Sequence, residues 1–174
     1  MMFRTHILFA LFFYLLFITI FPIQFSIIFT LVLCFGAILP DIDSPRSYVN
    51  RNYLLGFGRG VAAFSKHRGF WHSIYGLLIF FVISFVIVYF INAPLIFSIA
   101  LPIGYFMHLA ADSLNISGIK WLWKSKTFHL KWKISTGTIS EQIFFIILLL
   151  FTLYLIIGNQ GIQEITAFVT KIKP

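Results

Sequence analysis

Charged residues are scarce in this sequence. Only 10% of its 174 residues are Asp, Glu, Lys or Arg, five of them acidic, whereas 60% are hydrophobic. A mean hydropathy of +0.96 excludes an ordinary soluble domain and indicates an integral membrane protein. The formal net charge of +8 does not indicate a nucleic-acid partner, because nucleic-acid recognition needs an exposed basic face on a water-soluble fold.

Cysteine and histidine are also few. The single cysteine, Cys34, lies in an apolar run, so disulfides and zinc sites built only from thiolates are excluded. The absence of an HExxH motif excludes the zinc proteases that carry it, and five histidines are too few for a diiron lipid hydroxylase, which needs about eight.

What the sequence does have is long apolar stretches, at 7–21 with 23–39, 72–91, 94–111 and 139–157. A membrane-spanning helix needs about 20 mostly apolar residues. The first stretch, interrupted by Pro22 and Gln24, is too long for one span and is expected to form two helices. We therefore predict an all-α, polytopic membrane helix bundle of about five transmembrane helices with two interfacial cytoplasmic loops.

The distribution of basic residues predicts the orientation of this bundle. With five spans, the N-terminus and the loops 40–71 and 112–138 share one face, which carries eleven of the thirteen Lys and Arg residues; the opposite face has only Lys171 and Lys173. The positive-inside rule predicts a multi-pass protein of the cell (inner) membrane with a cytoplasmic N-terminus and an outside C-terminus. Tryptophans interleave with lysines in loop 112–138, which favours membrane lipids as partners.

The same frame gives the domain organisation. Residues 1–158 are expected to form a single transmembrane domain, and residues 159–174 a short extracytoplasmic tail. No cleavage site of small residues follows the first apolar segment, so that helix is expected to be retained as a signal anchor.

Most of the acidic residues and histidines fall at one level of this bundle. Because odd spans leave the cytoplasmic face and even spans return to it, residues far apart in sequence meet at that edge. Ionisable groups at the edge of spans are costly and usually functional. The candidate metal ligands of this layer are His6, Asp41, Asp43, His67, His72, His108 and Asp112.

Local spacings within this layer fit metal binding. His108 and Asp112 are four residues apart and share one helix face. Asp41 and Asp43 follow Pro40, and in an extended segment their side chains would point the same way. Imidazole with carboxylate favours zinc, with manganese, iron or magnesium as alternatives. Seven candidates exceed the three or four ligands of one catalytic zinc. We therefore expect either two ions or one ion whose ligands are hydrogen-bonded by the remaining candidates.

Two further residues of this layer are candidates for catalysis. Arg68 is either a clamp for a phosphate group or one more positive charge on the cytoplasmic face. Glu141 either orients a water molecule or caps the last span, where an acid stabilises a helix N-terminus.

The motifs that carry these residues resemble the YdjM-type family of predicted membrane-bound metal-dependent hydrolases. They are Thr5-His6, LPDIDSPRS at 39–47, HRGFWHS at 67–73, GYFMHLAADSLNISGIKWLW at 104–123, and Thr136-Gly137 followed by Glu141. Asn115 and Lys124 depart from the family's frequent threonine and proline. The resemblance implies a His/Asp metal site formed by the seven candidate ligands, and hydrolase activity.

The function expected from the sequence is a metal-dependent hydrolase at the cytoplasmic membrane face. A metal-activated water would attack a phosphoester or acyl bond of a lipid-like substrate, with phospholipase-, phosphatase- or amidase-like chemistry. The alternatives are a metal-ion transporter or sensor and a non-catalytic, stress-associated membrane protein.

Overall fold

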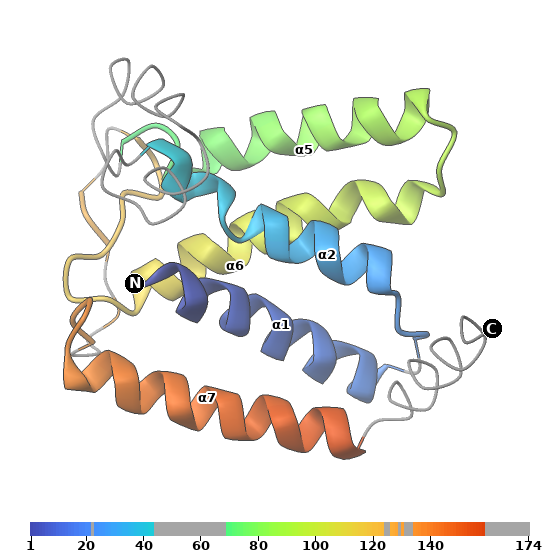
Figure 1. The fold of residues 1–174 in the computed structure, drawn as a ribbon. Helices are drawn as coiled ribbons and strands as arrows, with labels where there is room; N and C mark the ends of the chain where they lie inside the picture. Colours follow the sequence, from blue (N-terminus) through green and yellow to red (C-terminus); the bar gives the residue numbers. More distant parts are fainter. Residues whose placement is uncertain (22, 44–68, 124–125, 129, 131–133, 159–174) are drawn as a thin grey trace.

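The computed structural model describes residues 1–21, 23–43, 69–123, 126–128, 130 and 134–158. Within these residues the regular structure is helical, which confirms the all-α prediction (Figure 1). The elements are α1 (Phe3–Ile20), α2 (Ile27–Gly36), the 3₁₀ helix η1 (Leu39–Asp43), α5 (Ile74–Phe90), the 3₁₀ helix η2 (Leu95–Ile99), α6 (Ala100–Ser113) and α7 (Ile139–Gly158).

Five apolar helical segments correspond to the five predicted spans. Phe3–Ile20, Leu95–Ser113 and Ile139–Gly158 are long and apolar enough to cross a membrane, and Ile27–Asp41 and Ile74–Phe90 are shorter apolar helices. The side chains of α5 and α7 support a membrane setting, since both helices expose many large apolar residues. Lipid chains can cover such faces, whereas water could not do so without a large cost.

The break between the first two helices lies where Pro22 and Gln24 predicted it. α1 ends at Ile20, and α2 begins after Ser26, whose side chain accepts a hydrogen bond from the backbone N–H of Phe29. This is a helix N-cap, which satisfies a backbone donor that the first turn leaves free. Tyr14 fixes the turn, because its hydroxyl accepts a hydrogen bond from the Ser26 N–H at 3.1 Å.

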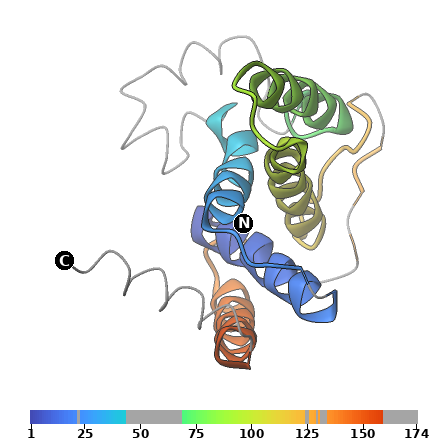
Figure 2. The same ribbon diagram turned by 90° about the vertical axis from the view of Figure 1, so that its right-hand side faces the viewer.

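Helix α6 lies at the centre of the bundle, packed against α1, α2 and α5, and α7 packs against α1 (Figures 1 and 2). Two glycines set the closest of these contacts. A Cβ atom on Gly36 would overlap the carbonyl oxygen of Leu101, and one on Gly104 would overlap that of Leu33. Small residues let two membrane helices approach with their backbones nearly touching, so α2 and α6 meet without intervening side chains.

One end of the bundle gathers the starts of α1, α5 and α7 with η1 and the end of α6 (Figure 1). Every described histidine and acidic residue belongs to one of these five segments or directly precedes it, so all of them lie at this end of the bundle.

Candidate metal centre

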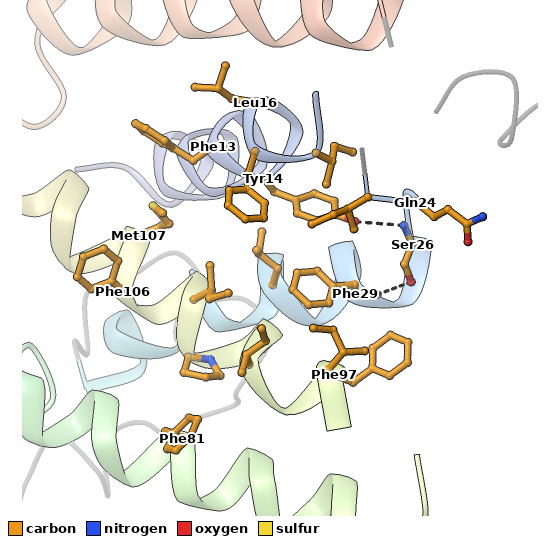
Figure 3. A pocket seen from close by; sticks show the side chains of 18 of the residues that line it. Phe13, Tyr14, Leu16, Gln24, Ser26, Phe29, Phe81, Phe97, Phe106 and Met107 are labelled. Atoms are coloured by element: carbon orange, nitrogen blue, oxygen red, sulfur yellow. Dashed lines mark hydrogen bonds between the residues drawn. The ribbon is translucent and has the colours of Figure 1, made fainter. Parts of the chain in front are cut away.

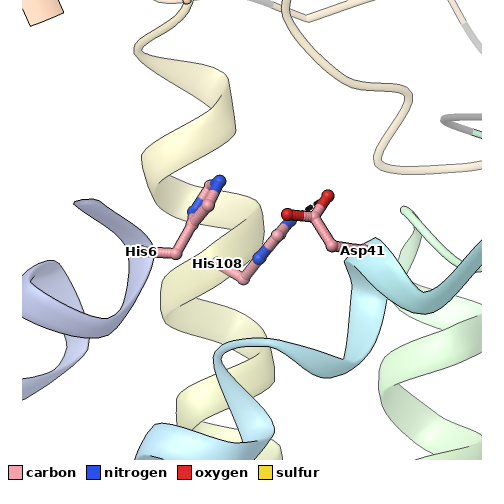
Figure 4. Close-up of side chains that lie close together, drawn as sticks. All are labelled: His6, Asp41 and His108. Carbon is pink, nitrogen blue, oxygen red and sulfur yellow. Dashed lines mark ion pairs between the residues drawn. The ribbon is translucent and has the colours of Figure 1, made fainter. Parts of the chain in front are cut away.

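Five of the seven predicted ligands converge at this end of the bundle. His6 comes from α1, Asp41 from η1, His72 from the turn before α5, and His108 and Asp112 from α6. Two overlapping groups, His6 with Asp41 and His108, and His72 with His108 and Asp112, have ligand atoms within 4.8 Å of one another and could hold a metal ion. Figure 4 shows the first of these groups.

The other predicted site residues are not placed. His67 and Arg68 lie outside the described residues, and so does the side chain of Asp43, although its backbone belongs to η1. Their roles stay predictions.

His108 is the residue that both groups share. Its Nδ1 lies 2.8 Å from the backbone carbonyl oxygen of Ala37, at the end of α2. A carbonyl oxygen can only accept, so Nδ1 carries the proton and donates it, which leaves the Nε2 lone pair directed at a ligand. Nε2 lies 3.8 Å from Asp41 Oδ1 and 4.0 Å from Asp112 Oδ2. One lone pair serves one ion, so the two groups compete for His108.

His6 lies against His108 and Asp112. The two imidazole rings stack with their centroids 3.7 Å apart and their planes at 13°. His6 Nε2 is 3.4 Å from Asp112 Oδ1, and the amino group of Met1 is 2.7 Å from the same oxygen. Asp112 therefore faces His6 with one carboxylate oxygen and His108 with the other.

His72 completes the cluster from the side of Asp41. Its Nε2 lies 3.7 Å from Asp41 Oδ1, and its ring meets the ring of His108 edge-on, with centroids 5.3 Å apart. Asp41 Oδ1 thus stands between two imidazole nitrogens. The Asp41 side chain is 16% exposed while those of His72 and His108 are fully buried, so the centre is open to its surroundings beside Asp41.

The turn that carries His72 is held by hydrogen bonds that the sequence did not predict. The hydroxyl of the fully buried Tyr105 donates a hydrogen bond to the backbone carbonyl of Trp71. The Ile74 N–H donates to the carbonyl of Trp121 at 2.9 Å, and Ser73 caps α5 by accepting from the Tyr75 N–H. Tyrosine inside an apolar span looks like a core residue in sequence, and only the packing of α6 against α5 shows its polar contact.

The conformation predicted for Asp41 and Asp43 was wrong. Both lie in η1, a 3₁₀ helix that begins at Leu39, and not in an extended segment. Pro40 permits this because a proline at the start of a helix has a suitable φ and lacks only an N–H that would have no partner there. With three residues per turn, positions i and i+2 do not share a side of the backbone, so the argument that paired these two aspartates no longer applies.

The side chains of the cluster fit a divalent metal. Within the described part of the chain, neither ring nitrogen of His6 nor Nε2 of His108 has a hydrogen-bond partner, although all three atoms are buried. Buried polar atoms are almost always satisfied. Ligand atoms about 2.1 Å from one ion at tetrahedral angles lie roughly 3.4 Å from each other. The four imidazole–carboxylate distances of 3.4 to 4.0 Å are at or slightly above this value.

Glu141 lies in the first turn of α7 and is fully buried. Its Oε1 accepts hydrogen bonds from the Met2 N–H at 2.6 Å and from the Thr5 hydroxyl at 3.0 Å, and its Oε2 accepts from the Gly137 N–H at 2.7 Å. The carboxylate therefore ties the start of α7 to the start of α1, immediately before His6. Its role in orienting water stays a prediction.

Known relatives match part of the chain. It is 33% identical over 109 residues to the uncharacterized protein YvsG of Bacillus subtilis (strain 168). The matched region covers 62% of this chain and 65% of that protein. It is 35% identical over 89 residues to the inner membrane protein YdjM of Escherichia coli (strain K12), which covers 49% of this chain and 44% of that protein. The match thus spans less than two thirds of either relative's length. No solved structure matches the chain.

The family comparison covers nearly the whole chain. Residues 1–171 match the family described as YdjM inner membrane protein, and the relatives of that name, together with the apolar helices, support a place in the inner membrane. The resemblance seen in the sequence motifs is thereby confirmed: this chain belongs to the YdjM inner membrane protein family.

Proposed function

We propose that this chain is a metal-dependent hydrolase of the inner membrane that acts on a lipid or another amphiphile. The observation that carries this proposal is the convergence of three buried histidines, the buried Asp112 and the partly exposed Asp41 from four separate elements into one cluster. Ionisable groups are expensive at membrane edges and are retained there mainly for function. Here they bring three buried imidazole nitrogens together without hydrogen-bond partners in the described chain.

His6, Asp41, His72, His108 and Asp112 would hold the metal, which we expect to be zinc because imidazole and carboxylate ligands suit it. When bound, such an ion supplies a water of lowered pKa and a positive charge facing the attacked phosphoryl or carbonyl oxygen. The protein fixes His108 by its bond to Ala37 and encloses the other imidazoles. Water and the polar part of the substrate would enter beside the partly exposed Asp41.

The orientation of the chain belongs to the same proposal. The excess of basic residues at the N-terminus and in loops 40–71 and 112–138 supports a cytoplasmic location for the metal centre. Arg68 would then be available to bind a phosphate group, and His67 and Asp43 to complete the ligand set.

Metal content of ligand variants tests the centre. The full chain, purified in detergent, is expected to retain zinc in elemental analysis, and His108→Ala and Asp112→Asn are each expected to lose it. The loss should exceed the roughly 10- to 100-fold fall in affinity typical of changing only an outer partner. His129→Ala, which alters a histidine outside the predicted ligands, is the matched control. If His108→Ala kept its full metal content, the proposed centre would be wrong.

Hydrolysis itself needs a separate assay. The zinc-loaded chain in vesicles of phosphatidylglycerol and phosphatidylethanolamine is expected to release a free fatty acid or a free phosphorylated headgroup, detected by mass spectrometry. The Asp112→Asn variant should leave the same lipids intact. Equal product from both proteins would show that the cluster is not the source of the activity.

A further inference from the structure

A large apolar cavity lies between α1, α2, α5 and α6, and nothing in the site described above uses it (Figure 3). Its volume is about 940 Å³, at the upper end of the about 300–1,000 Å³ typical of sites for small organic molecules. We infer that this cavity binds the hydrocarbon chain of a membrane lipid and, on the basis of the proposed function, that this lipid is the substrate whose polar part reaches the metal centre.

The lining favours an apolar occupant. Among the described residues that line the cavity, only Tyr14, Gln24 and Ser26 have polar side chains. The Tyr14 hydroxyl already accepts from the Ser26 N–H, and Ser26 Oγ accepts from the Phe29 N–H. Gln24 is exposed and points away from the other labelled side chains in Figure 3. Apolar cavities of this kind do not hold ordered water.

The cavity is continuous with the space that lipid would fill. Several lining side chains are strongly exposed, among them Ile20 at 64%, Ile96 at 58% and Leu78 at 53%. All three lie on, or at the end of, apolar helices of the bundle. In a bilayer, the material that surrounds such side chains is hydrocarbon, and an empty cavity would lose the dispersion contacts that hydrocarbon supplies. A lipid chain is therefore the occupant that fits both the lining and the surroundings.

The length of the cavity matches one leaflet. Along η2 and α6 it runs from Ile96 to Met107, which is roughly 18 Å at the usual rise per residue of 3₁₀ and α-helices. Half of the hydrocarbon core of a bilayer is about 15 Å thick. A single acyl chain whose polar end lies at the metal end could thus extend along the cavity toward the opposite end of the bundle.

The inner end of the cavity brings such a chain close to the candidate metal centre. Met107 lines the cavity and directly precedes His108, and Leu33 lines it one turn before Ala37, the residue that binds His108. Leu77 lines it on α5, five residues after His72. A lipid with its chain in the cavity would have its headgroup end at the level of the His/Asp cluster.

Photolabelling tests this inference without requiring hydrolysis. The full chain would be placed in nanodiscs with a phosphatidylglycerol probe that carries a diazirine at the end of its palmitoyl chain. After illumination, the labelled residues would be mapped by mass spectrometry. We expect labelling to concentrate on cavity residues such as Phe29, Phe97 and Ile103. Labelling spread evenly over the outer faces of α5 and α7 would overturn the inference. So would the absence of label on these cavity residues because a second copy of the chain covers them.

Variants with a larger side chain in the cavity provide a second test of the inference. Ile103→Trp should lose most of the cavity labelling, whereas Ile147→Trp, at an exposed position on α7 outside the lining, should keep it. Ile99→Phe is a milder filling variant, to be used if thermal unfolding of Ile103→Trp shows that it does not fold. Cavity labelling that persists in a folded filling variant counts against the inference.

The same measurements separate this inference from the proposed function. Cavity labelling in a chain that holds no zinc would support the lipid site and contradict the metal centre. Zinc binding without cavity labelling would support the metal centre and contradict the lipid site. A second probe, with the diazirine beside the headgroup, is expected to label residues near the metal centre such as Trp71 and Trp121. Headgroup labelling at the opposite end of the bundle would contradict the proposed placement of the substrate.

Discussion

At the scale of single residues, His108 and Glu141 have different roles at the end of the bundle that holds the candidate metal centre. His108 has one nitrogen committed to Ala37 and one directed at the acidic side chains. Glu141 has both oxygens engaged by donors of the protein, from Met2, Thr5 and Gly137. His108 thus keeps a nitrogen lone pair for a ligand, whereas the carboxylate of Glu141 already accepts hydrogen bonds from three donors of the protein. Glu141 thus acts on the centre through the position of α1.

The variant Glu141→Gln is expected to destabilise the fold and to spare the metal centre. An amide NH₂ in place of one carboxylate oxygen would face a donor, and leaving such a buried group unsatisfied costs about 1–3 kcal/mol. Thermal unfolding should show the loss, while zinc content per folded chain stays near that of the parent protein. Glu164→Gln, in the segment after α7, serves as the control. Unchanged stability together with lost hydrolysis would instead support the role of Glu141 in orienting water.

The convergence of the candidate ligands was predictable from sequence, because topology and not local pattern brings them together. A chain that crosses the membrane repeatedly returns His6, Asp41, His72 and His108 to one edge, and counting the spans is enough to see this. The contacts that orient them were not predictable. Tyr105 binds Trp71 only because α6 packs on α5, and neither the bond nor the role of Ala37 has a signature in sequence.

At the scale of elements, the contact between α2 and α6 positions the centre. Gly36 and Gly104 let the two backbones meet, and the same approach brings the Ala37 carbonyl within 2.8 Å of His108. The apolar runs predicted both helices well, because length and hydropathy suffice for that. They did not predict η1, where a proline that ends one helix starts the next turn.

Gly104→Ala should separate these helices and weaken the metal centre. The added methyl group would overlap the Leu33 carbonyl oxygen, and overpacking of this kind typically costs about 1–3 kcal/mol. Because His108 would also lose its bond to Ala37, zinc affinity should fall by about 10- to 100-fold. Gly158→Ala has open space around the new Cβ and should behave like the parent protein. Equal zinc affinity in both variants would show that the contact does not position His108.

At the scale of the whole molecule, the cluster joins parts of the chain that are otherwise held mainly by apolar packing. Its side chains belong to α1, η1, the turn before α5, and α6. A ligand that binds only the folded protein stabilises it in proportion to the logarithm of its concentration over Kd. A metal held by His6, Asp41 and His108 should therefore act as a cross-link between α1, η1 and α6.

Removal of the metal is accordingly expected to lower the Tm of the purified chain. At a free zinc concentration 100 times Kd, the ion would contribute about 2.7 kcal/mol. Differential scanning fluorimetry before and after treatment with a chelator measures the shift, and added zinc should reverse it. His108→Ala should show no response to either treatment. A Tm that does not change in the parent protein would contradict the proposed cross-link.

The bond network of Glu141 also sets an order for biosynthesis. The ribosome makes α1 first and α7 last, yet the carboxylate on α7 is what holds the backbone of Met2 and the hydroxyl of Thr5. A nascent chain that has inserted every helix except α7 therefore carries His6 on a segment whose final anchor has not been made. Secure placement of that histidine waits for the last span, so we expect the His/Asp cluster to reach its final arrangement only when synthesis of the bundle is complete.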